Sequence, residues 1–125
     1  MTHPGAPLTI FRRAVAAGDA QTALAVAGEL GTVDPADALA LVLVLLDGMP
    51  DRYPLAAARW HALAVRSAGA ASLADASVLL AALHGLADAG ARDDACASIE
   101  AWAARYGLRG VDRELTAWTA RRRRR

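Results

Sequence analysis

The chain has few of the residues that build sheets, disulfides and membrane spans. Its 125 residues include one cysteine, one phenylalanine, two isoleucines and no lysine. The lone Cys96 cannot form an internal disulfide, so we expect a protein of the reducing cytoplasm. The longest apolar run, Ala38 to Leu46, is far shorter than the about 20 residues that cross a bilayer, and no apolar leader opens the chain. We therefore expect no membrane partner, and the lack of β-branched and aromatic runs disfavours strands.

Alanine is the most abundant residue, at 33 of 125, and leucine is the main large apolar side chain. Both favour helices. Gly18 and Gly90 each separate two alanine-rich segments, as expected where two antiparallel helices are joined closely. The sequence predicts an all-α, single-domain bundle of about three antiparallel helical hairpins plus a short C-terminal helix. We expect six to seven helices in a repeat-like but irregular array over residues 9–120, after a disordered N-terminus (1–8) and before a basic tail (121–125).

Polar residues mark where several of these helices begin. Asp19, Asp34 and Ser72 are each placed to accept hydrogen bonds from free amides at a helix start, and Pro35 suits a first turn. Gly85 lies inside a helical pattern, which indicates a close helix crossing. The predicted helices cover about 9–17, 20–30, 35–47, 54–67, 73–89 and 93–106, with a short seventh after residue 112.

Hydrophobic spacing predicts which helix faces are buried. The third predicted helix is apolar nearly all round and should be the most buried element. For three other helices the spacing selects one stripe each: Ile10, Ala14 and Ala17 in the first, Leu55, Ala58, Ala62 and Val65 in the fourth, and Leu73, Leu79, Leu80, Leu83 and Leu86 in the fifth.

Two resemblances support this architecture. Aligning Gly18 with Gly90 superimposes Ala23 on Ala95, and Pro35 follows Gly18 by 17 residues, which resembles a degenerate tetratricopeptide-like hairpin. The chain is also similar to short, all-helical actinobacterial proteins of unassigned function. That similarity rests on the segments 23–27, 37–41, 52–53 and 58–61 and on the arginine-rich end. It implies an all-α bundle of hairpins and brings no activity.

Residues suited to metal binding or catalysis do not cluster in the sequence. His3, His61, His84 and Cys96 lie on different elements, without the i, i+3 or i, i+4 spacing that places two metal ligands on one helix. Asp93 and Asp94 are adjacent, about 100° apart on a helix, so they fit a helix start better than a facing carboxylate pair. We expect no metal, no cofactor and no enzymatic activity.

A cluster of arginines beside an aromatic residue is the main candidate for partner binding. Arg59 and Arg66 are seven residues apart and share a helix face, Arg52 could extend the line, and Trp60 and His61 adjoin it. The cluster is either a basic strip for an acidic partner or a phosphate backbone, or an ordinary charged outer face. Since aromatic residues and arginine dominate contact energies, the candidate protein-binding residues are Arg59, Trp60, Arg66, Trp102, Tyr106 and Trp118.

The last five residues, Arg121, Arg122, Arg123, Arg124 and Arg125, are the second candidate site. Without them the chain has nine arginines against 13 acidic residues, a net charge of −4. The run is either an electrostatic tether for nucleic-acid phosphates, with no sequence preference, or a solvated end. The leading interpretation is a non-enzymatic protein-interaction or adaptor module. The alternative is an accessory nucleic-acid-associated protein that uses the C-terminal arginines and the strip with Arg59 and Arg66. Homo-oligomers through alanine-rich faces are compatible with both.

Overall fold

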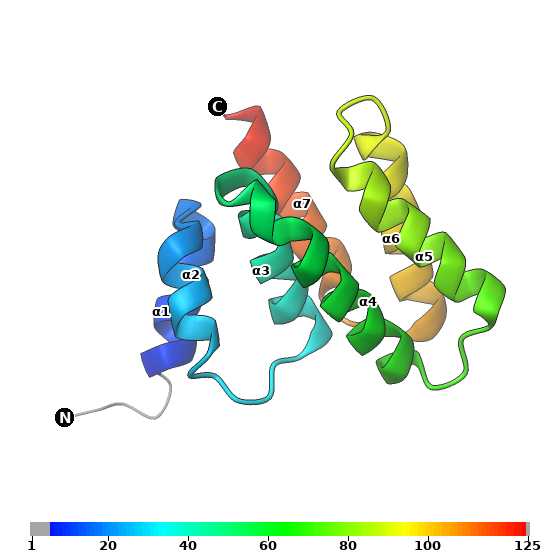
Figure 1. Ribbon diagram of the computed structural model, residues 1–125, viewed down its shortest axis with the longest axis horizontal. Helices are drawn as coiled ribbons and strands as arrows, with labels where there is room; N and C mark the ends of the chain where they lie inside the picture. The colour runs from blue at the N-terminus through cyan, green and yellow to red at the C-terminus, as the bar shows by residue number, and fades with distance from the viewer. Residues whose placement is uncertain (1–5, 125) are drawn as a thin grey trace.

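The computed structural model describes residues 6–124, which contain seven α-helices and no strand (Figure 1). This confirms the predicted all-α class. In chain order the elements are α1 (Ala6–Ala17), α2 (Ala20–Ala27), α3 (Pro35–Gly48), a 3₁₀ turn η1 (Pro50–Arg52), α4 (Tyr53–Ala68), α5 (Leu73–Leu86), α6 (Arg92–Tyr106) and α7 (Val111–Arg123).

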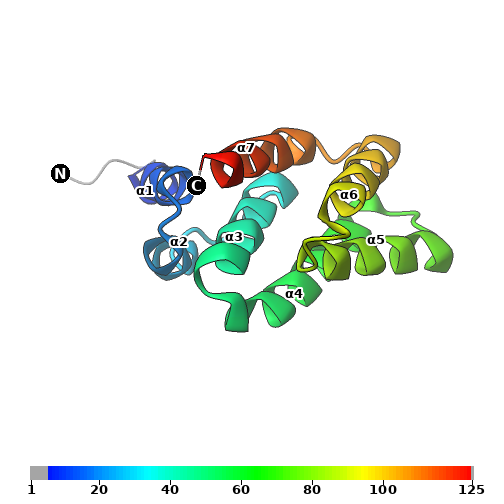
Figure 2. The same cartoon turned by 90° about the horizontal axis from the view of Figure 1, so that it is seen from above.

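The helices pair as the hairpins α1–α2, α3–α4 and α5–α6, and α7 returns across the bundle to pack on α3 and α6 (Figures 1 and 2). Helix α3 is the central element, in contact with α1, α2, α4 and α7. Its Ala40 and Val44 join a core with Phe11 of α1, while its Leu39 and Leu43 join a larger core shared with α4 to α7. The prediction that this helix is the most buried is confirmed by the six buried residues along it.

Local hydrogen bonds confirm three of the predicted helix starts. The carboxylate of Asp34 accepts from the amide of Asp37 at 2.8 Å, and that of Asp19 accepts from Thr22 at 3.1 Å. The Ser72 hydroxyl accepts from Asp75 at 3.0 Å. Each bond satisfies an amide that has no partner inside its own helix, so these starts are fixed by local chemistry.

The helix ends differ from prediction in four places, the first being α2, which ends at Ala27 rather than near residue 30. Helix α1 begins at Ala6, with Pro7 in its first turn, so residues 6–8 are helical rather than disordered, and residues 1–5 lie outside the described range. Helix α5 ends at Leu86, earlier than expected, because Asp88 turns the chain by accepting from the Gly90 amide at 3.0 Å. Helix α7 is not short: it continues through Arg123 and takes in most of the predicted tail.

The buried face of α4 is not the predicted one. Leu55, expected in the core, is 59% exposed, and Ala58 and Ala62 also face solvent. The buried residues are instead Tyr53, Ala57, Trp60 and Ala64. Aromatic rings bury more apolar area than leucine, and both rings gain a bond on burial: the Tyr53 hydroxyl donates to Leu83 O at 2.6 Å and the Trp60 indole to Pro35 O at 2.8 Å.

The apolar stripes predicted for two other helices are only partly buried. In α1 the buried residues are Phe11, Ala14 and Val15, whereas Ile10 and Ala17 are exposed. In α5 the residues Leu79, Leu83 and Leu86 are buried, but Leu73 and Leu80 face solvent. Each of these helices has more apolar residues than its neighbours cover.

At two helix crossings the backbones approach so closely that glycine, which has no side chain, is needed. A Cβ added to Gly85 would lie 3.1 Å from the Cβ of Ala95, which confirms the predicted close crossing, here between α5 and α6. The crossing of α2 and α3 is tighter still, because a Cβ on Gly48 would lie 2.7 Å from the Cβ of Ala20. Carbon atoms cannot approach so closely, so a side chain at position 48 must push α2 away from α3.

We expect Gly48→Ala to lower the free energy of unfolding by about 1–3 kcal/mol, although alanine is the better helix former. Urea denaturation measures the change. Adding Ala20→Gly removes the clashing carbon, so the double variant should show a favourable coupling free energy. Gly28→Ala is the matched control, since its new Cβ would meet only Ala25 O at 3.8 Å. A Gly48→Ala variant as stable as wild type would contradict this account of the crossing.

Candidate protein-binding groove

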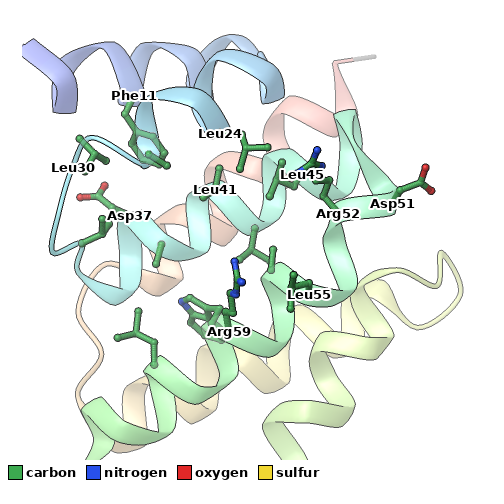
Figure 3. A pocket seen from close by; sticks show the side chains of 17 residues that line it. Phe11, Leu24, Leu30, Asp37, Leu41, Leu45, Asp51, Arg52, Leu55 and Arg59 are labelled. Atoms are coloured by element: carbon green, nitrogen blue, oxygen red, sulfur yellow. The ribbon is translucent and has the colours of Figure 1, made fainter.

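An apolar groove lies between α2 and α4, with α3 as its floor (Figure 3). Leu24 and Leu30 line the side formed by α2 and the segment after it, Leu41 and Leu45 rise from α3, and Leu55 lines the α4 side. The cavity has a volume of about 400 Å³, within the range of roughly 300–1,000 Å³ typical of ligand sites. We call this site the groove.

The groove exists because the cover over α3 is incomplete. Helices α2 and α4 each pack against α3, and the α2 helix is only eight residues long. Small side chains, among them Ala27, Ala38 and Ala56, line the space between them. Because alanine is too short to fill such a space, Leu41 of α3 stays partly exposed, while Leu45 in the same helix is buried.

Two arginines stand at the α4 edge of the groove. Arg52, at the end of η1, and Arg59, on α4, both line it and both are exposed. Within residues 6–124 neither side chain makes a hydrogen bond or ion pair, and the neighbouring Asp51 points away (Figure 3). The carboxylate of Asp37 at the other end is already paired with Arg12, Nη2 to Oδ2, at 3.1 Å. The groove therefore joins an apolar floor to a cationic edge.

The residues predicted for partner binding do not form one site. Arg59 and Trp60 both line the groove, with the Trp60 ring buried in its wall. Arg66 is exposed further along α4 and does not line the groove. His61 faces α5 instead, where its Nε2 lies 2.7 Å from Ala76 O. Only Arg52, Arg59 and Trp60 of the predicted cluster come together.

The tryptophans of α6 and α7 are internal: Trp102 is 5% exposed and Trp118 is fully buried, so neither ring forms part of the described surface. The Trp102 indole donates to Asp75 O at 2.8 Å. Beside it Tyr106 is half-buried, with the two ring centroids 4.5 Å apart, and its hydroxyl donates to the Asp75 carboxylate. That bond raises the pKa of Tyr106. This cluster ties the end of α6 to the start of α5.

The remaining titratable candidates stay apart. Cys96 is half-buried, and burial raises the pKa of its thiol, which opposes formation of a nucleophilic thiolate. His84 is exposed on α5, and Asp93 and Asp94 are exposed in the first turn of α6. His3 lies outside the described residues.

The arginine run is partly built into the fold. Arg122 pairs with Asp47, whose side chain is 5% exposed, and its guanidinium lies 5.1 Å from the ring centroid of Trp118. The Trp118 indole donates to the same carboxylate at 2.8 Å. Arg121 is partly buried in α7, Arg123 and Arg124 are exposed, and Arg125 lies outside the described residues. Asp47 thus draws the run into α7, which explains why no separate tail starts at Arg121.

The leucines of the groove were not predicted as a site. Leu24, Leu41 and Leu45 have the spacing and flanking residues of ordinary core positions. Leu24 and Leu41 are partly exposed because of the distance between α2 and α4, two helices that are not joined directly in the chain. No local feature of the sequence predicts the distance between these two helices.

We expect Arg122→Ala to lower the free energy of unfolding by about 1–3 kcal/mol, because a nearly buried carboxylate loses its counter-charge. Arg124→Ala, two residues away and exposed, is the control and should change it by less than about 0.5 kcal/mol. The measurement is the urea midpoint of both variants and wild type. Equal stability of the two variants would show that Arg122 does not anchor α7.

The described residues contain no group of three or more His, Cys, Asp or Glu side chains able to hold a metal ion. In the same range no helix combines the length and apolar character needed to cross a membrane. No protein-family model, curated protein or solved structure matches this chain. Among the features of the described residues, the groove gives the best support for a function.

Proposed function

We propose that the protein is a non-enzymatic interaction module whose groove holds an amphipathic helix of a partner protein. The partner's apolar side chains lie on Leu41 of α3 and against Leu24 and Leu55 at the two sides, and its acidic side chains meet Arg52 and Arg59. The observation that carries this proposal is the open groove between α2 and α4, apolar along its floor and cationic along one edge.

The shape of the groove suits a helix. Its floor runs along α3 from about Asp37 to Leu45, eight residues or about 12 Å, which is two helical turns. Over two turns a partner helix presents apolar side chains at positions i, i+3 or i+4, and i+7 on one face. The edge residue Leu55 would lose its solvent contact under such a helix, so docking removes apolar surface that the isolated chain exposes.

The edge charges set the chemistry of the partner. Arg52 and Arg59 have no acidic partner of their own among residues 6–124, so they are available to glutamate or aspartate. A basic helix would meet the same two guanidinium groups and be repelled. Charges at the edge of an apolar contact mainly fix orientation and exclude wrong partners.

The accessory nucleic-acid role has less support. Arg122 pairs with Asp47, and Arg121 lines the same hollow as Glu114. Arg123 and Arg124 are the exposed arginines at the described end of α7. Even with the exposed Arg59 and Arg66 of α4 added, so few phosphate contacts would give weak binding that is lost as salt rises. A cytoplasmic adaptor role is supported by more of the exposed features of the fold, because it involves both the apolar groove and the arginines at its edge.

A displayed library of helical peptides tests the proposal without knowledge of the natural partner. Selection on wild type should enrich apolar residues at helical spacing together with glutamate or aspartate on one edge. Leu55→Glu and Arg59→Glu should each weaken the enriched peptides by about tenfold or more, measured by fluorescence anisotropy.

Arg66→Glu is the matched control, since it makes the same charge change on the exposed face of α4 outside the groove, and binding should change by less than about twofold. Three results would refute the proposal: no enrichment over the Leu55→Glu variant, enrichment of lysine and arginine, or equal loss of binding in the Arg59 and Arg66 variants.

A further inference from the structure

Helix α5 presents an apolar face to solvent. Among the described residues, the large apolar side chains that remain exposed are Ile10, Leu55, Leu73, Val78 and Leu80. The last three lie within eight residues of α5 and are 86%, 53% and 51% exposed. None of them lines the groove, so this face is a separate surface.

The apolar face continues from α5 onto α4, and the two helices lie next to each other in the bundle (Figures 1 and 2). The Nε2 atom of His61 on α4 lies 2.7 Å from Ala76 O, so the side of α5 that carries Ala76 is turned toward α4. Leu73 and Leu80 are three residues before and four after Ala76, and therefore share that side. On α4 the exposed residues within three positions of His61 include two alanines, Ala58 and Ala62.

This two-helix face carries positive charge and no free carboxylate. Residues 52–87 hold three arginines against one aspartate, a net charge of +2 in a chain whose total is +1. The aspartate, Asp75, accepts from the Tyr106 hydroxyl and lies 3.6 Å from Arg105. Arg66 is exposed on α4 and has no hydrogen bond or ion pair within residues 6–124. An anionic surface therefore meets an available cation here and no opposing charge.

The exposed side of α5 has few groups that would hold a protein partner in one position. From residue 73 to 84 only two of its exposed residues are polar: Ser77 and His84. A protein partner is usually fixed by about one hydrogen bond per 100–200 Å² of contact. A lipid surface needs no such matched groups, because its attraction depends on the buried apolar area and on the charge of the headgroups.

We propose that this face adsorbs to an anionic lipid bilayer, with Leu73 and Leu80 entering the boundary between headgroups and acyl chains. Arg66 meets the lipid phosphates and carboxylates. Exposed apolar residues bordered by arginine are typical of helices that lie in a membrane interface. The expectation of no membrane partner rested on the lack of an apolar run able to cross a bilayer, and adsorption at the surface requires no such run.

The binding is weak and reversible, because few large side chains enter the lipid and each arginine near an anionic surface strengthens binding only about fivefold. Vesicle sedimentation of the full chain tests it. Vesicles of equal parts phosphatidylcholine and phosphatidylserine should bind the protein at least about fivefold more tightly than phosphatidylcholine alone, and added salt should release it. Absence of binding to the anionic vesicles, or equal binding to both kinds, would overturn the proposal.

Two variants with the same charge change test the face. Leu80→Glu should weaken binding to the anionic vesicles by about tenfold or more, because a carboxylate replaces an apolar side chain that enters the lipid. Ile10→Glu, at a site on α1 that is 46% exposed, is the matched control and should weaken it by less than about threefold. Circular dichroism checks that both variants keep their helix content. Equal loss in the two would show that net charge, including that of the terminal arginines, holds the protein instead.

A fluorescent label on the folded chain reports the orientation without a charge change. In a Cys96→Ala background, Ser77→Cys carries an environment-sensitive fluorophore on the α5 face. Thr116→Cys, exposed on α7 at the far side of the bundle from α4, is the control (Figure 2). Anionic vesicles should shift the emission of the Ser77 label to shorter wavelength and leave the Thr116 label unchanged. Equal shifts at both sites, or a shift at Thr116 alone, would contradict the proposed face.

Arg66→Glu separates this proposal from the groove. It should weaken vesicle binding by about fivefold or more, while the peptides selected on the groove lose less than about twofold. A wild type that ignores vesicles, together with a Leu80→Glu variant that loses the selected peptides, would make α5 part of a protein interface and overturn lipid binding. Because the peptide selection contains no lipid, failure of this proposal and failure of the groove proposal are distinguishable.

Discussion

The fold depends on covering one helix that is apolar almost all round. Between Asp37 and Asp47 helix α3 has no charged residue, so every side of it has to be shielded from water by other helices. Helices α1 and α2 cover one side, α4 another, and α7 a third. The two ends of the apolar segment are closed by charge pairs, Arg12 with Asp37 and Arg122 with Asp47. The remaining side, between α2 and α4, is the groove. The candidate site is thus the part of the central helix that its neighbours leave open.

Each tryptophan joins its helix to the end of another one. The indoles of Trp60, Trp102 and Trp118 donate to Pro35 O, Asp75 O and the Asp47 carboxylate, at the start of α3, the start of α5 and the end of α3. An indole has one donor, and a buried one without an acceptor would cost about 1–3 kcal/mol. These three bonds therefore fix where the helices cross, and they are also why residues typical of binding hot spots are inside the molecule.

The sequence could identify the helices but not all of their faces, and the reason is physical. The starts at Asp19, Asp34 and Ser72 are set by side chains that bond to amides three residues away, so local sequence is sufficient. The face of α4 is set by competition between two apolar stripes, one with Leu55 and one with Trp60. Only the acceptor at Pro35, on another helix, decides between them. The path of Arg122 into α7 likewise depends on Asp47, 75 residues earlier in the chain.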